Sequence, residues 1–134
     1  MEAAFDGGSL ISGGAVLHLR AVDSAIGLIA RLCGCISDHR HQSYVDHSLG
    51  DLMRQRIYQI ACGYENANDC DSLRSDPAFK MACNRWAVTG DDLASQPTIS
   101  RLENRVRRSE LYRLAQAFVD VFIASYEAAV KFRP

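Results

Sequence analysis

The residues whose types and spacing could bind DNA lie between Thr98 and Arg108, where small polar side chains alternate with arginines. Arg101 and Arg105 are four residues apart, so a helix would place both guanidinium groups on one side. Small polar groups near a helix N-terminus and arginines on its exposed side are the groups that contact phosphates and base edges. The types and spacing of these residues therefore suit contacts with DNA. The candidate DNA-binding residues are Thr98, Ser100, Arg101, Asn104, Arg105, Arg107 and Arg108, with Arg54 from an earlier segment.

The distribution of charge supports this hypothesis only locally. The chain of 134 residues has a net charge of −1 and a pI of about 6.4, whereas small autonomous nucleic-acid binders are usually basic. From Arg101 to Arg113, however, five arginines stand against Glu103 and Glu110. The alternative interpretation is a solvated, arginine-rich surface in which these two glutamates pair with the arginines and no DNA is bound.

Two other sets of side chains invite a metal ion. A Cys-x-Cys pair and a His-x-His pair lie within nine residues and offer ligands that zinc accepts. Because their spacing matches no standard zinc finger, buried thiols and solvated histidines are the favoured interpretation. This set is Cys33, Cys35, His39 and His41. An acidic set lies at predicted helix starts and in loops, which favours capping and ion pairing over a metal site. It contains Asp69, Asp71, Asp76, Asp91 and Asp92. We assign no metal ligand and no catalytic residue.

The elements that position these residues are predicted to be mainly α-helical. Apolar residues recur at helical spacing in five stretches, about 22–35, 48–63, 77–84, 97–105 and 109 onward. Capping residues support these starts, namely Asp23 or Ser24, Ser48, Asp76 and Ser109. Paired glycines between short apolar runs predict a short β-hairpin or arm over residues 1–21. The predicted fold is thus one helical domain of about five helices over residues 22–134, preceded by that arm.

Two predicted helices have unusual faces. Arg56 falls within the apolar face of the 48–63 helix, where it needs a carboxylate or a route to solvent. A structural ion pair is the favoured role and a DNA phosphate the alternative; the candidate partners are Glu65, Asp69, Asp71 and Asp76. The last helix carries two apolar stripes, which indicates burial on most sides or a partner surface. They are Leu111, Leu114, Ala115, Phe118, Val121, Phe122 and Ser125, and Val119, Ile123 and Tyr126.

Composition restricts the class of protein further. With 48% apolar residues, a chain of this length can bury a core, which argues against disorder. Five scattered cysteines do not indicate the disulfide framework of a secreted protein. No leader sequence and no apolar run of about 20 residues is evident, so we expect a cytoplasmic protein without a membrane segment.

Three segments resemble a known family. They are LGDLMRQRIYQIACGYENAND (49–69), DSLRSDPAF (71–79) and LASQPTISRLENR (93–105), and the start Phe5-Asp6-Gly7-Gly8 is also typical. They are similar to the N-terminal signature of bacterial insertion-sequence transposases of the DDE type (transposase DDE domain group 1), which cut and rejoin DNA with three metal-binding carboxylates. Residues 98–104 also resemble the recognition helix of Cro-type repressors. The stretch before them is too short for the first helix of such a motif, and Pro97 interrupts it.

The family resemblance implies a DNA-recognition domain that binds the terminal inverted repeats of an insertion sequence and helps to pair two transposase subunits. In that family the first catalytic Asp lies in a strand shortly after the long last helix, and this sequence stops at Pro134. We therefore expect no cofactor in this chain, with Mg²⁺ required only by the intact enzyme. The expected partners are inverted-repeat DNA, a second copy of the chain, or intact transposase.

The main alternative is a protein-interaction module that dimerises through the Phe118–Tyr126 helix and does not bind DNA. Such a module could inhibit intact transposase by forming mixed complexes. The arginine cluster distinguishes the two hypotheses, because a pure dimerisation module has no need of it. A third alternative, a small zinc protein, rests only on the Cys and His pairs.

Overall fold

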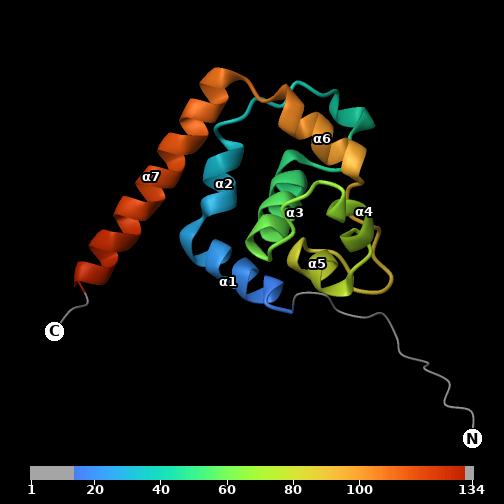
Figure 1. Cartoon of the computed structure of the whole chain (residues 1–134), viewed down its shortest axis with the longest axis horizontal. Coiled ribbons are helices and arrows are strands. Elements are labelled where there is room, and N and C mark those ends of the chain that lie inside the picture. The colour runs from blue at the N-terminus through green and yellow to red at the C-terminus, as the bar shows by residue number, and fades with distance from the viewer. Residues whose placement is uncertain (1–13, 132–134) are drawn as a thin grey trace, which may run out of the picture.

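The structure is a computed structural model that describes residues 14–131, and seven α-helices and one short 3-10 helix make up its regular elements (Figure 1). They are α1 (Val16–Ile26), α2 (Leu28–Cys33), η1 (Gln42–Tyr44), α3 (Leu49–Ala61), α4 (Asp69–Leu73), α5 (Pro77–Ala82), α6 (Gln96–Arg105) and α7 (Arg108–Lys131). The predicted mainly α-helical class is confirmed. The predicted number of helices was too low.

The β-hairpin predicted for residues 1–21 has no support in the described residues. Residues 1–13 lie outside them, and no residue from 14 to 131 is in a β-strand. Instead α1 begins at Val16, a side chain with no exposed surface. α1 packs against α5 and buries Val16 and part of Leu19, contacts that a lone hairpin would lack. The prediction of extended structure is therefore wrong for residues 16–21.

The helix predicted for residues 22–35 is divided by Gly27. This glycine has a φ of +68°, in the left-handed region that other residues rarely adopt. Its N–H donates to the Asp23 carbonyl and ends α1, while the Asp23 carboxylate accepts a 2.8 Å hydrogen bond from the Ile29 amide and caps α2. Asp23 is thus a capping residue, as predicted, but for a helix that begins later than expected.

The helix α3 lies at the centre of the molecule, with α2 on one side and α4, α5 and α6 on the other (Figure 1). Its start is the predicted one, since the Ser48 hydroxyl accepts a hydrogen bond from the Asp51 amide. Its end is also as predicted, because Gly63 follows with a φ of +94°. The core around it is formed by buried side chains that include Leu32, Leu52, Tyr58, Phe79, Leu93 and Ile99.

Two short helices follow α3, of which only the second was predicted. α4 has five residues, too few to show a helical period in the sequence. α5 begins where Asp76 was expected to cap it, with the carboxylate accepting hydrogen bonds from the Ala78 and Phe79 amides at 2.9 and 3.3 Å. The described chain then runs without regular structure to Ser95, as predicted, before α6 begins.

The last helix, α7, lies along one side of the molecule and packs against α2 (Figure 1). It begins at Arg108, so Ser109 lies inside its first turn and is not the predicted cap. The Glu110 carboxylate takes that role by accepting a 2.7 Å hydrogen bond from the Arg107 amide. Only Glu110 and Ala117 are buried in α7, so the alternative of burial on most sides is wrong.

No helix in the described part of the chain combines the length and apolar character that crossing a bilayer requires.

Candidate nucleic-acid interface

The helix α6 presents one polar side outward and buries the other. Ile99 and Leu102 are 0% and 4% exposed and attach the helix to the core. Arg101 and Asn104 are exposed on the opposite side. The flanking hydroxyl of Ser100 is half-buried and accepts a 2.8 Å hydrogen bond from the Gln96 side chain. This arrangement leaves a long cation and an amide as the freest groups on α6, both suited to base edges or phosphates.

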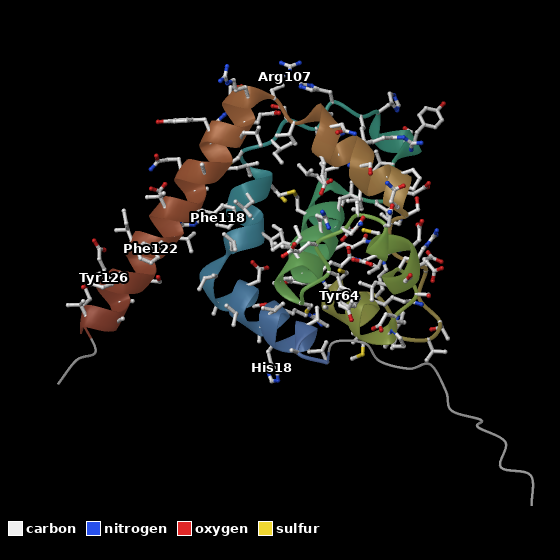
Figure 2. The ribbon with its side chains drawn as sticks, viewed as in Figure 1. His18, Tyr64, Arg107, Phe118, Phe122 and Tyr126 are labelled. Atoms are coloured by element: carbon white, nitrogen blue, oxygen red, sulfur yellow. The ribbon has the colours of Figure 1, made fainter. Side chains whose placement is uncertain are left out.

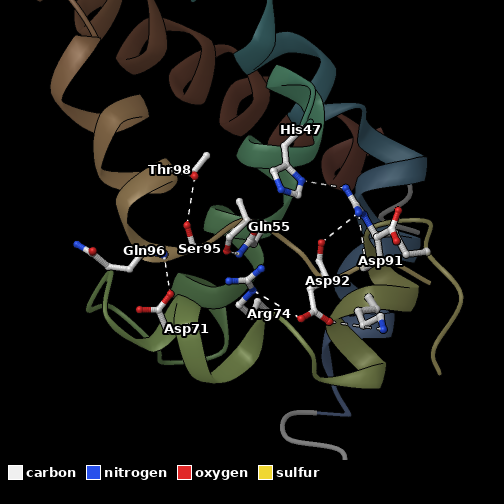
Figure 3. Close-up of polar contacts among 12 residues, drawn as sticks. His47, Gln55, Asp71, Arg74, Asp91, Asp92, Ser95, Gln96 and Thr98 are labelled. Carbon is white, nitrogen blue, oxygen red and sulfur yellow. Dashed lines mark hydrogen bonds and ion pairs between the residues drawn. The ribbon is translucent and has the colours of Figure 1, made fainter. Parts of the chain in front are cut away.

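The start of α6 is fixed by side chains from two earlier helices (Figure 3). The buried amide of Gln55 on α3 donates to the Ala94 carbonyl at 2.8 Å and accepts from the Ala94 amide at 2.9 Å. The Asp71 carboxylate on α4 accepts a 2.9 Å hydrogen bond from the Gln96 amide. A carboxylate at this position satisfies a free N–H group and interacts favourably with the helix dipole.

Arg56 attaches the middle of α6 to α3. Its Nε donates to the Glu103 carboxylate, and its Nη2 donates to the Glu65 carbonyl at 2.8 Å. The expectation of a structural ion pair is therefore confirmed, but the partner was not among the predicted carboxylates. Glu65 contributes its backbone instead. With 13% of its side chain exposed, Arg56 serves to dock α6.

The loop between α2 and α3 lies beside α6 and is organised by Asp38. Its carboxylate accepts hydrogen bonds from Arg40 Nε and Nη2 at 2.8 and 2.7 Å, and it also pairs with Arg105 Nη1 at 3.4 Å. The hydrogen bonds from Arg40, with a smaller contribution from Arg105, lower the pKa of Asp38 to about 2. Arg40 Nη1 donates to the His47 carbonyl at 2.9 Å. One carboxylate thus orients two arginines at the same place.

Two adjoining hollows of about 210 and 320 Å³ lie along this loop and share Arg40 and Arg105 in their walls. Arg101 lines the first hollow and Arg107 the second. We call this surface, defined by Arg40, Arg101, Arg105 and Arg107, the arginine groove. Two donors of Arg105, Nε and Nη2, are buried and have no hydrogen-bond partner among the described residues. Unsatisfied donors of this kind favour an oxygen-rich or anionic partner.

The two glutamates of this region do not pair with the guanidinium groups of the arginine groove. Glu103 binds Arg56. Glu110 uses one carboxylate oxygen for the Ser37 amide at 2.9 Å and the other for the Arg107 amide at 2.7 Å. These hydrogen bonds, first from Arg107 and then from Ser37, lower the pKa of Glu110. The carboxylate that pairs with arginines of the groove is Asp38, which the sequence did not suggest, and Asp46 and Glu110 also line the two hollows.

A family model described as transposase DDE domain group 1 matches residues 1–132. The chain belongs to this family. Membership confirms the resemblance seen in the sequence and connects the chain with DNA transposition, and with DNA in general. No curated protein and no solved structure matches the chain.

In this transposase-family chain, the predicted DNA-binding residues do not all lie together. Those that line the arginine groove are Thr98, Arg101, Arg105 and Arg107. Ser100 and Asn104 lie on another flank of α6, and Arg108 is exposed at the start of α7. Arg54 stands apart, because it pairs with Asp51 one turn earlier on α3 at 3.4 Å and lines neither hollow. Only Arg54 therefore lacks a place near α6.

Arg40 and the exposed ring of Tyr44 were not predicted from the sequence. Arg40 lines both hollows, and Tyr44 lines the first with 87% of its surface exposed. The Tyr44 ring lies 5.4 Å from the His41 ring, centroid to centroid. The signal available was a polar, histidine-rich loop that contains an arginine and an aromatic residue. That combination is not specific without knowledge that the loop lies against α6.

The zinc alternative is not supported. Between residues 14 and 131, no three side chains among His, Cys, Asp and Glu converge closely enough to hold a metal ion. Cys33 packs against the core, and Cys35 Sγ donates to the Arg31 carbonyl. Three residues of the acidic set act as predicted. Asp71 and Asp76 accept hydrogen bonds from amides at helix starts, and Asp92 pairs with Arg74 at 3.7 Å and Lys80 at 3.9 Å (Figure 3).

Proposed function

We propose that this chain binds duplex DNA through α6 and the arginine groove, and that its target is the terminal inverted repeat of an insertion sequence. The observation that carries the proposal is the arrangement of charge. Four arginines line one groove, where Asp38 pairs with two of them and Asp46 is the one aspartate among the described lining residues, while the nearby glutamates are committed to Arg56 and to backbone amides. Family membership supports DNA as the polyanion.

Within this proposal, some side chains contact bases and others contact the phosphates of the DNA backbone. Arg101 and Asn104 are exposed along α6, and both side chains can form paired hydrogen bonds with base edges in a major groove. Arg107 and Arg108 lie at the junction of α6 and α7, where they suit phosphates of the adjacent backbone. Arg40 is held by Asp38 and suits a fixed phosphate contact from the neighbouring loop.

The Mg²⁺ expected of a DDE enzyme does not fit the described part of the chain, where no group of three ligand side chains converges. We therefore assign this chain a recognition role and no cleavage step.

Fluorescence anisotropy tests the proposal directly. We would titrate the chain onto a labelled duplex from the inverted repeat that flanks its coding locus, and onto a scrambled duplex, across a series of salt concentrations. We expect tighter binding to the repeat, with Arg101→Ala weakening that preference by about tenfold or more. Arg107→Ala should instead weaken binding to both duplexes equally.

The matched control is Arg31→Ala, which removes the same charge from an exposed position on α2. It should leave both affinities nearly unchanged. Equal affinity for the repeat and the scrambled duplex, insensitive to Arg101→Ala, would leave only nonspecific phosphate attraction. No binding to either duplex at moderate salt would refute the proposal.

A second candidate function is self-association through α7, and the exposure of this helix favours it. Leu114, Ala117 and Val121 are buried or half-buried on α7, which packs against α2. Phe118, Phe122 and Tyr126 project from this helix in Figure 2, and they belong to eight large apolar residues that are 49–73% exposed. They are Leu111, Tyr112, Phe118, Val119, Phe122, Ile123, Tyr126 and Val130. We call them the α7 apolar face. Monomeric proteins rarely expose so many neighbouring apolar side chains without a partner.

The size of this face is sufficient for a dimer. A fully buried aromatic side chain removes roughly 150–250 Å² from water. Four of the eight residues are aromatic, and half to three-quarters of the surface of each is still exposed. Together the eight approach the roughly 800 Å² that a stable interface buries on each partner. Sedimentation equilibrium would test this: a dimer that Phe122→Asp converts to a monomer supports the second candidate, whereas Gln116→Asp, on the polar side of α7, should not dissociate it. A monomer at all concentrations would exclude it. If such a dimer forms without any DNA binding, the interaction module replaces the first proposal.

A further inference from the structure

A third hollow with a different chemistry lies at the end of the molecule opposite to the α6–α7 junction. It is formed by α1 and the chain that leaves α5, two elements that pack together there (Figure 1). Its volume is about 470 Å³, and its lining residues are Arg20, Met81, Asn84, Arg85, Trp86 and Ala87. None of them belongs to the arginine groove.

The most prominent group in this hollow is the indole of Trp86. It is the only tryptophan of the chain and is 80% exposed. Tryptophans of folded proteins are on average largely buried, because the ring removes a large apolar area from water. An indole that stays in solvent at the wall of a hollow is therefore a group available to a ligand.

The backbone beneath this indole is held firmly. The Gly90 amide donates to the Trp86 carbonyl at 3.1 Å and closes a tight turn. A Cβ atom at Gly90 would lie only 2.5 Å from that carbonyl oxygen, so the turn requires glycine. Arg85, which directly precedes Trp86, is fixed as well. Its guanidinium donates to the Asp92 carbonyl at 3.1 Å and contacts His47 Nδ1 at 3.0 Å. The exposed ring thus stands on a rigid support.

The charge of the hollow selects the kind of ligand. Among the described residues, both charged members of its wall, Arg20 and Arg85, are cations, and none is an Asp or Glu. Arg85 is occupied by the contacts that fix the turn. Arg20 Nη1 donates to the Met81 carbonyl at 3.0 Å, which orients its guanidinium while its other donors remain for a ligand. A planar apolar surface beside an oriented cation fits a flat ring that carries an anion.

We propose that this hollow binds one unpaired nucleotide of a DNA strand, with the base stacked on Trp86 and the phosphate on Arg20. Stacking on an exposed aromatic ring and phosphate contact with a nearby arginine are the two interactions by which proteins hold single strands. A base within a duplex is stacked on both faces and does not offer this surface. The site is separate from the arginine groove, so the inference does not rest on duplex recognition by α6.

Because the chain has a single tryptophan, its fluorescence reports on this hollow alone. We would titrate the chain with a ten-nucleotide deoxythymidine strand and follow Trp86 emission. We expect saturable quenching, with Arg20→Ala weakening the affinity by about tenfold. Anisotropy of the labelled strand should show a loss of about tenfold or more for Trp86→Ala and little loss for Trp86→Phe, which keeps an aromatic face.

The matched control is Val88→Ala, an exposed residue of the same loop that does not line the hollow; it should bind the strand like the unmodified chain. Repeating the titration in the Arg101→Ala, Arg107→Ala background separates this site from the proposed duplex interface, because quenching should persist there. Strand binding without any change in Trp86 emission would overturn the inference. So would equal affinity for deoxythymidine monophosphate, which would indicate a site for free nucleotides, or for a duplex of the same length.

Discussion

The side chain of Gln55 holds the start of the candidate interface from inside the core. It is 1% exposed, and its amide forms both of its hydrogen bonds with the backbone of Ala94, directly before α6. We predict that Gln55→Leu lowers the free energy of unfolding by about 2–4 kcal/mol, because it leaves a buried N–H and a buried carbonyl without partners. Urea unfolding measures this, and Gln116→Leu on exposed α7 should change stability by less than about 0.5 kcal/mol.

Replacing Asp38 is expected to lower the stability of the fold and to raise its affinity for DNA. Because its pKa falls from 3.8 to about 2 on folding, it contributes stability above pH 4 that is lost as the pH falls towards 2. We predict that Asp38→Asn lowers stability at neutral pH by about 1 kcal/mol, allowing for the solvent near this group, and flattens the acid dependence between pH 4 and 2.

The same substitution removes the counter-charge of Arg40 and Arg105. Affinity for duplex DNA at low salt should therefore rise even though the fold is weaker. Urea unfolding at several pH values and anisotropy measure the two effects. A variant that is both less stable and a weaker DNA binder would show that the orientation of Arg40 and Arg105 by Asp38 matters more for DNA binding than its opposing charge.

At the level of elements, the turn that joins α5 to the loop before α6 depends on Gly90. A Cβ atom there would meet the Trp86 carbonyl oxygen and amide nitrogen at 2.5 and 2.7 Å, both of which belong to backbone. We predict that Gly90→Ala destabilises the fold by about 1–3 kcal/mol. Gly50→Ala is the matched control, because its Cβ would meet nothing closer than 3.8 Å within α3; it should be neutral or stabilising by up to about 1 kcal/mol. Thermal unfolding compares the two, and equal losses would contradict the role of the turn.

His47 connects this turn to the loop beside α6, since its Nδ1 accepts a hydrogen bond from Arg85 (Figure 3). Burial, and then the charge of Arg85, lowers the pKa of His47 below 6.5. The unfolded chain therefore binds the proton more readily, and stability should fall as the pH drops below about 6.5. We predict a larger loss of melting temperature between pH 7.5 and 5.5 for the unmodified chain than for His47→Gln. Identical losses would contradict this coupling.

The helices were predictable from sequence where a local signal sets them. The caps by Ser48 and Asp76 and the glycine after α3 involve groups within three residues of each other, and the structure confirms them. The partners of Gln55 and Arg56 lie 39 and 47 residues away, and no local pattern specifies such pairs. α4 is too short to show a period, and the break at Gly27 was visible only as one glycine within an apolar run.

The candidate site was predictable to a similar extent. The spacing of Ile99 and Leu102 sets which side of α6 is buried, and Arg101 and Arg105, which were predicted to share one side of the helix, line the same hollow. Of these two, only Arg101 is fully exposed, because Arg105 is half-buried against Asp38. The contribution of Arg40 was not predictable, because it depends on how the loop after α2 folds back onto α6. For the same reason Asp38 could not be recognised as the counter-charge of the arginine groove.

For the molecule as a whole, a small patch of positive charge on a nearly neutral chain limits the electrostatic part of DNA binding. At most five arginines lie at the proposed interface, namely Arg40, Arg101, Arg105, Arg107 and Arg108. The logarithm of the binding constant should therefore fall with the logarithm of salt concentration with a slope no steeper than about −4.5. Anisotropy across the salt series measures this slope. A much steeper value would mean that further cations, outside this surface, contact the duplex.

The residues that attach α6 to the rest of the molecule differ from those on its outward side, and this division bears on how the DNA sequence that is bound could be changed. The anchoring residues Ile99, Leu102 and Glu103 face the core or α3, whereas Ser100, Arg101 and Asn104 take little part in that attachment. The outward positions can therefore be randomised as a small cassette without rebuilding the interior. A library restricted to these three positions should yield folded variants in high proportion, which would make this helix a practical starting point for retargeting the domain to new sequences.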